Sequence, residues 1–208
     1  INFDIEKNKT LGLLGPNGCG KTTSIGMMLG LIKPTSGQIF IDNKNLESFK
    51  RNDILARINF ASPYIELPKK LTVRQNLEVY GRLYGIENRK ERIEEISEDL
   101  NIKDFFHRKT GELSSGQKNR VSLAKSLINK PEILLLDEPT ASLDPDIGDF
   151  VRSYIQDYSS KNKVTILLAS HNMAEVERLC DSIIMMKSGK IIDRGTCKEI
   201  IDKHGRNN

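Results

Sequence analysis

Nearly unbroken apolar runs mark the positions of buried strands along the chain. Thr10–Leu14, Ile133–Leu136 and Val164–Ala169 have the length of strands and carry almost no polar side chain. Runs of this kind are typical of strands that are covered on both faces, as in parallel sheets. Apolar and polar residues alternate over Ile1–Ile5, which predicts a half-buried strand. Shorter strands are predicted at 38–42 and 58–61.

Segments of helical length and spacing separate these strands. After Asn88, apolar residues recur at Ile93, Ile96 and Leu100, so one stripe of a charged helix is buried and the charged face is solvated. Ser188-Gly189, between two apolar stretches, is typical of a hairpin. Helices are predicted at 22–32, 73–84 with Thr72 as cap, 89–100, 118–129, 147–158, 173–181 and 197–203.

Alternation of strands and helices predicts an α/β fold with a mostly parallel sheet flanked by helices, and the hairpin adds a small antiparallel part. The chain is expected to form a single domain over residues 1–208. No strand is evident in 63–129, which we interpret as an α-helical lobe inserted into a core made of 1–62 and 130–208. Because the chain begins at Ile1, without methionine and inside a predicted strand, we expect that an N-terminal segment is missing.

Composition narrows the function classes only a little. The 32 Lys and Arg residues against 28 Asp and Glu give a net charge of +4 without clustering, so no nucleic-acid partner is expected. Three widely spaced cysteines argue against a disulfide framework or a zinc site and suit a reducing cytoplasm. No apolar run approaches the roughly 18 residues of a membrane helix, so a membrane role would need a partner.

The stretch after the first buried strand fits the phosphate-binding pattern G-x-x-x-x-G-K-[ST], which makes the expected fold that of a P-loop NTPase. Glycines let the backbone come close to an anion, and the following helix adds positive charge at its N-terminus. Lys21 can reach the β- and γ-phosphates of ATP, and the Thr22 hydroxyl can ligate Mg²⁺, the expected cofactor. The predicted ATP-binding residues are Gly15, Pro16, Asn17, Gly18, Cys19, Gly20, Lys21, Thr22 and Thr23.

Polar residues end the two later buried strands. Asp137 follows Ile133–Leu136, at the position where ligands gather in open α/β sheets, and is predicted to hold Mg²⁺ with Thr22. Glu138 comes next and could act as general base on the attacking water. His171, at the end of the following strand, could hydrogen-bond the γ-phosphate and the water. A lone histidine is more often structural.

Several motifs follow one another in a fixed order: GPNGCGKT at 15–22, LSSGQ at 113–117, ILLLDEP at 133–139, ASLD at 141–144 and SH at 170–171. This order, over essentially the whole chain, resembles the ATP-binding cassette (ABC) family, the ATPase subunits of ABC transporters. The resemblance implies a machine of two subunits in which ATP is clamped between the phosphate loop of one and LSSGQ of the other. Ser114, Ser115, Gly116 and Gln117 would then act in trans, and Asp144 would contact the opposite site.

Two departures from the family pattern stand out. The family has a glutamine at the entry to the helical lobe, which senses Mg²⁺ and couples to the membrane partner. Here that position falls at Ser62 or Pro63, so water or Ser62 would have to replace it. The aromatic residue that stacks on adenine in the family lies upstream of Ile1.

The stretch 62–73 and the later Leu83–Gly85 look most like exporter-type cassettes. The resemblance implies ATP, a second copy or homologous subunit and an integral membrane permease as partners, at the cytoplasmic face of the membrane. Two alternatives remain. One is a soluble ABC ATPase acting on nucleic acid or ribosomes, although no sustained heptads and no second cassette are present. The other is a weakly hydrolysing regulator, which the missing glutamine leaves open.

Cys19 lies inside the phosphate loop and admits two interpretations. It could be a small filler whose side chain points away from the nucleotide. Alternatively, the loop N–H groups, Lys21 and the helix N-terminus could lower the thiol pKa and make it an oxidisable switch that blocks ATP binding. Cys180 and Cys197 lie far along the chain and provide internal references.

Overall fold

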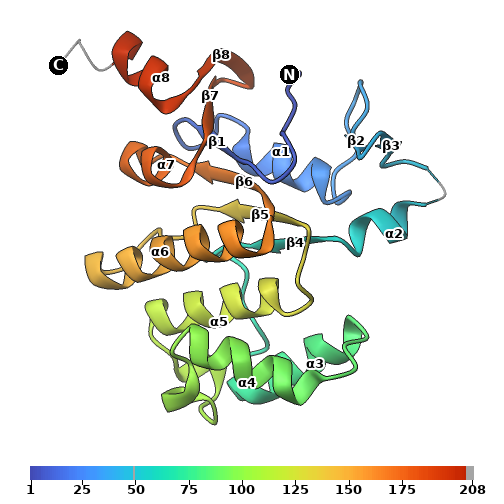
Figure 1. Ribbon diagram of the computed structural model, residues 1–208, viewed down its shortest axis with the longest axis vertical. Coiled ribbons are helices and arrows are strands. Elements are labelled where there is room, and N and C mark those ends of the chain that lie inside the picture. Colours follow the sequence, from blue (N-terminus) through green and yellow to red (C-terminus); the bar gives the residue numbers. More distant parts are fainter. Residues whose placement is uncertain (49, 205–208) are drawn as a thin grey trace.

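Six strands form one sheet in the computed structural model, which describes residues 1–48 and 50–204 (Figure 1). Their spatial order is β4-β5-β6-β1-β7-β8. All neighbours pair in parallel except β7 and β8, which form the antiparallel hairpin. The strands are β1 Thr10–Leu14, β4 Ile58–Ala61, β5 Ile133–Asp137, β6 Thr165–Ser170, β7 Ser182–Lys187 and β8 Lys190–Gly195. The predicted fold class is therefore confirmed.

Alternate residues of the central strands pack on opposite faces. Leu134 and Leu136 of β5 belong to a core cluster with Val151, whereas Leu135 belongs to a second cluster with Ile25. Both faces are therefore covered by helices, which explains why these strands are continuous apolar runs. The helices are α1 Lys21–Met28, α2 Arg51–Leu55, α3 Val73–Leu83, α4 Arg89–Asp99, α5 Ser115–Leu127, α6 Pro145–Asn162, α7 Met173–Leu179 and α8 Cys197–His204.

Register brings the carboxyl ends of three neighbouring strands to the same edge of the sheet. Leu14 pairs with Ser170, and Asp137 pairs with Ala169, so β1, β6 and β5 end side by side. Within residues 1–48 and 50–204, no helix is long and apolar enough to cross a membrane.

The segment 63–129 contains α3, α4 and α5 with two 3₁₀ turns at Lys103–Phe105 and Thr110–Glu112, and these elements lie together at one end of the molecule (Figure 1). Within the described part of this segment, the only extended pairing is an isolated bridge between Thr72 and Lys109. Its apolar side chains share one core cluster with the sheet. Helices of this segment and the sheet thus share a hydrophobic cluster. The division of the chain into an ATP-binding lobe and a helical lobe therefore stays our interpretation.

Several predicted elements differ from the structure. Residues 1–5 are not a strand, because no described strand pairs with them, although Phe3 and Ile5 do pack against the core. The strand predicted at 38–42 shrinks to β2, Phe40–Ile41, which pairs only with the short β3, Lys44–Asn45.

Several predicted helix boundaries also move; α6, for example, runs over Pro145–Asn162 instead of 147–158. Helix α1 ends at Met28 instead of residue 32, and Gly30 just beyond it has the left-handed φ of 66° that often follows a helix end. Helix α5 begins at Ser115 instead of residue 118, because Ser114 and Gln117 form a reciprocal capping box.

Candidate active site

The phosphate loop connects β1 to α1 at the carboxyl edge of the sheet. Gly18 and Gly20 have φ values of 78° and 108°, which favour glycine. A Cβ on Gly15 would lie 2.4 Å from the carbonyl oxygen of Met186, so the close approach of the β7–β8 hairpin also requires glycine there. Gly20 is the N-cap of α1 and supplies no side-chain acceptor, so the first N–H groups of the helix remain available to an anion.

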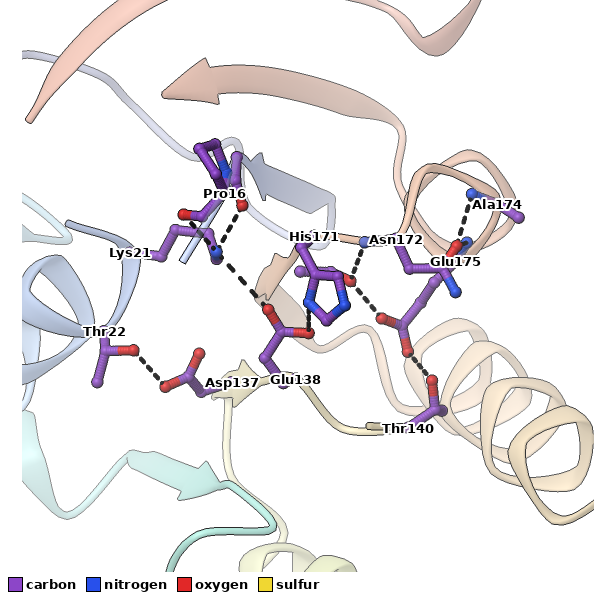
Figure 2. A network of polar contacts seen from close by, with 12 residues as sticks. Pro16, Lys21, Thr22, Asp137, Glu138, Thr140, His171, Asn172, Ala174 and Glu175 are labelled. Atoms are coloured by element: carbon purple, nitrogen blue, oxygen red, sulfur yellow. Dashed lines mark hydrogen bonds and ion pairs between the residues drawn. The ribbon is translucent and has the colours of Figure 1, made fainter. Parts of the chain in front are cut away.

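Lys21 points back over the loop that precedes it (Figure 2). Its Nζ donates to the carbonyl oxygens of Gly15, at 2.7 Å, and Pro16, at 3.3 Å. The side chain is only 5% exposed, and Nζ lies 3.6 Å from Oε1 of Glu138. The lysine therefore holds a buried positive charge between the loop and the end of β5.

Glu138 joins Lys21 to His171 at the centre of Figure 2. Its Oε2 lies 2.8 Å from Nδ1 of His171, within ion-pair distance. Nε2 of the ring remains for another partner. Glu138 is itself buried. Its φ of 54° is unusual for a non-glycine residue, and its backbone N–H donates to the carbonyl oxygen of Ala169 at 2.8 Å. The backbone is thus held in a strained conformation that aims this carboxylate at the loop.

Asp137 and Thr22 form the other polar pair of the site. The Thr22 hydroxyl donates to Oδ2 of Asp137 at 2.7 Å. Burial raises the pKa of the Asp137 carboxyl, and the hydrogen bond from Thr22 offsets part of that increase. Oδ1 of Asp137 is buried and accepts no hydrogen bond from any residue that the structure describes. An exposed hydroxyl beside a buried carboxylate that has one oxygen without a hydrogen bond fits a hard divalent cation such as Mg²⁺.

The signature LSSGQ lies at the start of α5. Ser114 is the N-cap, and Ser115, Gly116 and Gln117 form the first turn. Ser114 and Ser115 are exposed, and so is Asp144, the N-cap residue of α6. Among the described residues, no hydrogen bond or ion pair connects the signature or Asp144 with the phosphate loop. The structure therefore brings together the loop, Asp137, Glu138 and His171, and it leaves the two serines of the signature exposed away from them.

Comparison with known proteins identifies the family. The family model described as ABC transporter matches residues 1–141. This chain belongs to the ABC transporter family. It is an ATP-binding subunit of the ABC ATPase type. The family and the ATPase activity that the motifs predicted are therefore confirmed.

Relatives in this family match almost the whole chain. The ABC transporter ATP-binding protein NatA of Bacillus subtilis is 37% identical, covering 97% of this chain and 82% of NatA. The Nod factor export ATP-binding protein I of a Rhizobium species is 36% identical, covering 98% and 67% of the two chains. The bacitracin transport ATP-binding protein BcrA of Bacillus licheniformis is 37% identical, covering 93% and 62%. The chain thus spans only about two thirds of the latter two relatives.

Solved structures of ABC proteins share the fold. CbiO1 of Clostridium perfringens, part of the cbiONQ transporter complex, has a TM-score of 0.84 at 30% identity, covering 98% of this chain and 83% of its own. The cassette MJ0796, in a dimeric post-hydrolysis state with ADP and Pi, has a TM-score of 0.86 at 26% identity, covering 95% and 89%.

Ser62 is one of the two positions, with Pro63, at which the glutamine of the family was expected. It directly follows β4, next to the strand that carries Asp137, and it is buried. Its hydroxyl accepts the N–H of Tyr64 at 3.3 Å, and no hydrogen bond joins it to Thr22 or Asp137 within the part of the chain that the structure describes. Replacement of the glutamine by Ser62 therefore stays a prediction.

Sequence reasoning missed a polar cluster behind the site. Glu175 in α7 accepts hydrogen bonds from Thr140 and Ser170, both at 2.6 Å (Figure 2). One signal was available: Asn172 and Glu175 have the N-x-x-E spacing of a helix start. The partners of Glu175, however, lie on two other segments and follow only from the fold.

The Cys19 side chain is buried among the core residues of the second cluster and is 3% exposed. A side chain in this position supports the filler interpretation and leaves a reagent little access to the thiol. Cys180 is also buried, and burial raises the pKa of its thiol, whereas Cys197 is partly exposed.

We predict that iodoacetamide modifies Cys197 before Cys19 or Cys180 in the folded protein, because attack needs an accessible thiolate. Mass spectrometry of each cysteine peptide over time, with and without MgATP, measures the order. Labelling of Cys19 faster than Cys197, slowed by MgATP, would restore the switch interpretation.

Proposed function

We propose that this chain is the ATPase subunit of an ABC exporter, with two copies or two homologous subunits binding ATP between them. One observation carries the proposal: Glu138 is buried and contacts both Lys21 and His171 at the carboxyl edge of the sheet, where the phosphate loop begins. The relatives named for Nod factor export and bacitracin transport support the exporter direction.

Phosphate binding would use the loop and α1. Oxygens of the γ-phosphate would replace the carbonyl oxygens of Gly15 and Pro16 as acceptors for Nζ of Lys21. The N–H groups at the start of α1 would supply further donors. Thr22 and Asp137 would hold Mg²⁺. When bound, Mg²⁺ neutralises charge on the β- and γ-phosphates.

Hydrolysis would use Glu138 as general base. Its carboxylate takes a proton from a water molecule, the water oxygen attacks the γ-phosphorus, and the bond to the ADP oxygen breaks. The 2.8 Å contact between Nδ1 of His171 and Glu138 would orient that carboxylate and leave Nε2 for the γ-phosphate. Ser114–Gln117 of the second copy would close the site from the other side, and Asp144 would contact that copy.

A hollow beside Ser62 offers a surface for the membrane permease. It has a volume of about 310 Å³ and lies between residues 63–67, the start of α5 and residues 141–143. At its rim Tyr64 is 72% exposed and Ile65 is 46% exposed. Exposed apolar side chains around a hollow are typical of a protein-binding site. The permease would hold the ATPase at the cytoplasmic face of the membrane.

We predict that Glu138→Gln lowers the rate of ATP turnover by about 100-fold or more, because the amide cannot accept the proton of the attacking water. ATP binding should be preserved. Steady-state hydrolysis and calorimetric binding measure the two effects. Glu132→Gln, just before the same strand, serves as the matched control. Hydrolysis by Glu138→Gln at the wild-type rate would exclude Glu138 as the base, and uniformly slow hydrolysis by the wild-type chain would favour the regulator alternative.

We predict that Tyr64→Ala reduces recovery of an integral membrane protein with the tagged chain from detergent-solubilised membranes, because the substitution removes the most exposed aromatic ring at the hollow. Phe40→Ala, which removes an exposed ring on β2, should leave recovery unchanged. Quantitative mass spectrometry of the purified complexes gives the ratio. Recovery of ribosomes or nucleic acid in place of a membrane protein would contradict the exporter proposal.

A further inference from the structure

A buried carboxylate lies directly behind Glu138 and His171. Glu175, in the first turn of α7, is 2% exposed. Its Oε1 accepts the hydroxyl of Thr140 and its Oε2 accepts the hydroxyl of Ser170, both at 2.6 Å (Figure 2). With so little exposed surface, this carboxylate is no candidate for direct contact with nucleotide or water.

The two hydroxyls belong to the two segments that carry the proposed catalytic side chains. Thr140 follows Glu138 by two residues, and Ser170 directly precedes His171. Backbone pairing of β5 with β6 ends at Asp137 and Ala169, with one further hydrogen bond from the N–H of Glu138 to Ala169. Past that point, the Glu175 side chain accepts a hydrogen bond from each of the two segments.

The hydroxyl protons give the cluster a direction. A hydroxyl has one proton, and that of Ser170 is donated to Glu175, so its lone pairs are left for other donors. One of these lone pairs accepts the N–H of Asn172 at 3.0 Å, which fixes the turn that holds His171. In a usual capping box Glu175 would itself accept that N–H. Here Ser170 replaces it, and the carboxylate is free to bridge the two segments.

No cation lies within ion-pair distance of Glu175 among the described residues. Burial of a charge without a counter-ion destabilises a fold. A neutral glutamine could keep the bridge, because its carbonyl accepts one hydroxyl and its amide N–H donates to the oxygen of the other. Glutamine should therefore preserve both the fold and the bridge, whereas an apolar side chain of similar volume should remove the bridge.

We propose that Glu175 is a positioning residue for ATP hydrolysis: by bonding Thr140 and Ser170, it fixes the separation of Glu138 and His171. The proposal rests on the roles assigned above to those two residues. Loss of both acceptors should loosen the 2.8 Å contact between Nδ1 of His171 and Oε2 of Glu138. Binding of ATP should change little, since none of the Lys21 contacts involves this cluster.

Glu175→Met tests the proposal because methionine keeps the side-chain volume and accepts no strong hydrogen bond. We expect kcat to fall roughly 10- to 100-fold, as small misplacements of catalytic groups do, with KM for ATP within about twofold of wild type. Glu175→Gln should restore kcat to within about threefold. Glu177→Met, an exposed position on the same helix, is the matched control.

Nitrogen NMR of the imidazole rings supplies a readout that a purely structural role would not move. The resonance of Nδ1 of His171, assigned with His171→Gln, should shift in Glu175→Met and return in Glu175→Gln, while His107 stays unchanged. Circular dichroism verifies folding. Should Glu175→Met not fold, Thr140→Val combined with Ser170→Ala removes both donors and should reproduce the fall in kcat and the Nδ1 shift.

Three results for folded Glu175→Met would overturn the proposal. These are a kcat equal to that of wild type, a KM for ATP that changes by as large a factor as kcat, or an Nδ1 resonance of His171 at its wild-type position. The parallel Glu138→Gln measurement keeps this outcome separate from failure of the proposed function. If Glu138→Gln is inactive and Glu175→Met is normal, only the positioning role is wrong. If Glu138→Gln is active, the catalytic assignment itself is wrong.

Discussion

Parallel pairing of β5, β6 and β1 is the constraint on which the rest of the structure depends. Parallel strands in register end at the same edge, and each of these three passes directly into a segment with polar function. Strand β1 leads into the phosphate loop, β5 ends at Asp137 with Glu138 following, and β6 ends at Ser170 before His171. Since both faces of these strands are buried, a slip in register would disrupt the packing of two core clusters at once.

The side chains of the site hold one another in place through direct contacts. Lys21 is bonded to loop carbonyl groups and lies near Glu138, Glu138 contacts His171, and Thr22 bonds Asp137. These contacts reduce the cost of burying opposite charges, and they prearrange the groups that ATP would meet. The signature at Ser114–Gln117 is well formed, with its capping box complete, yet it lies outside this network. One copy therefore holds only half of the proposed ATP site.

The sequence predicted those parts of the molecule that local patterns determine. Continuous apolar runs located the buried strands, and motif spacing located Lys21, Asp137, Glu138 and His171 at their ends. Alternation at Ile1–Ile5 predicted the burial of Phe3 and Ile5 correctly but the strand wrongly, because a strand also needs a partner. The capping box that moves the start of α5 to Ser115 was legible and was missed. Contacts between distant segments, such as the bridge at Glu175, depend on the tertiary fold and leave little local trace.

A structure of the chain bound to magnesium and a non-hydrolysable ATP analogue tests the central claim most directly. We expect the β- and γ-phosphates against the N–H groups of the loop, with Nζ of Lys21 moved from the carbonyl oxygen of Gly15 to a phosphate oxygen. Ser114–Gln117 of a second copy should contact the same γ-phosphate. An analogue bound away from Lys21, or held by one copy with the signature still exposed, would contradict this account.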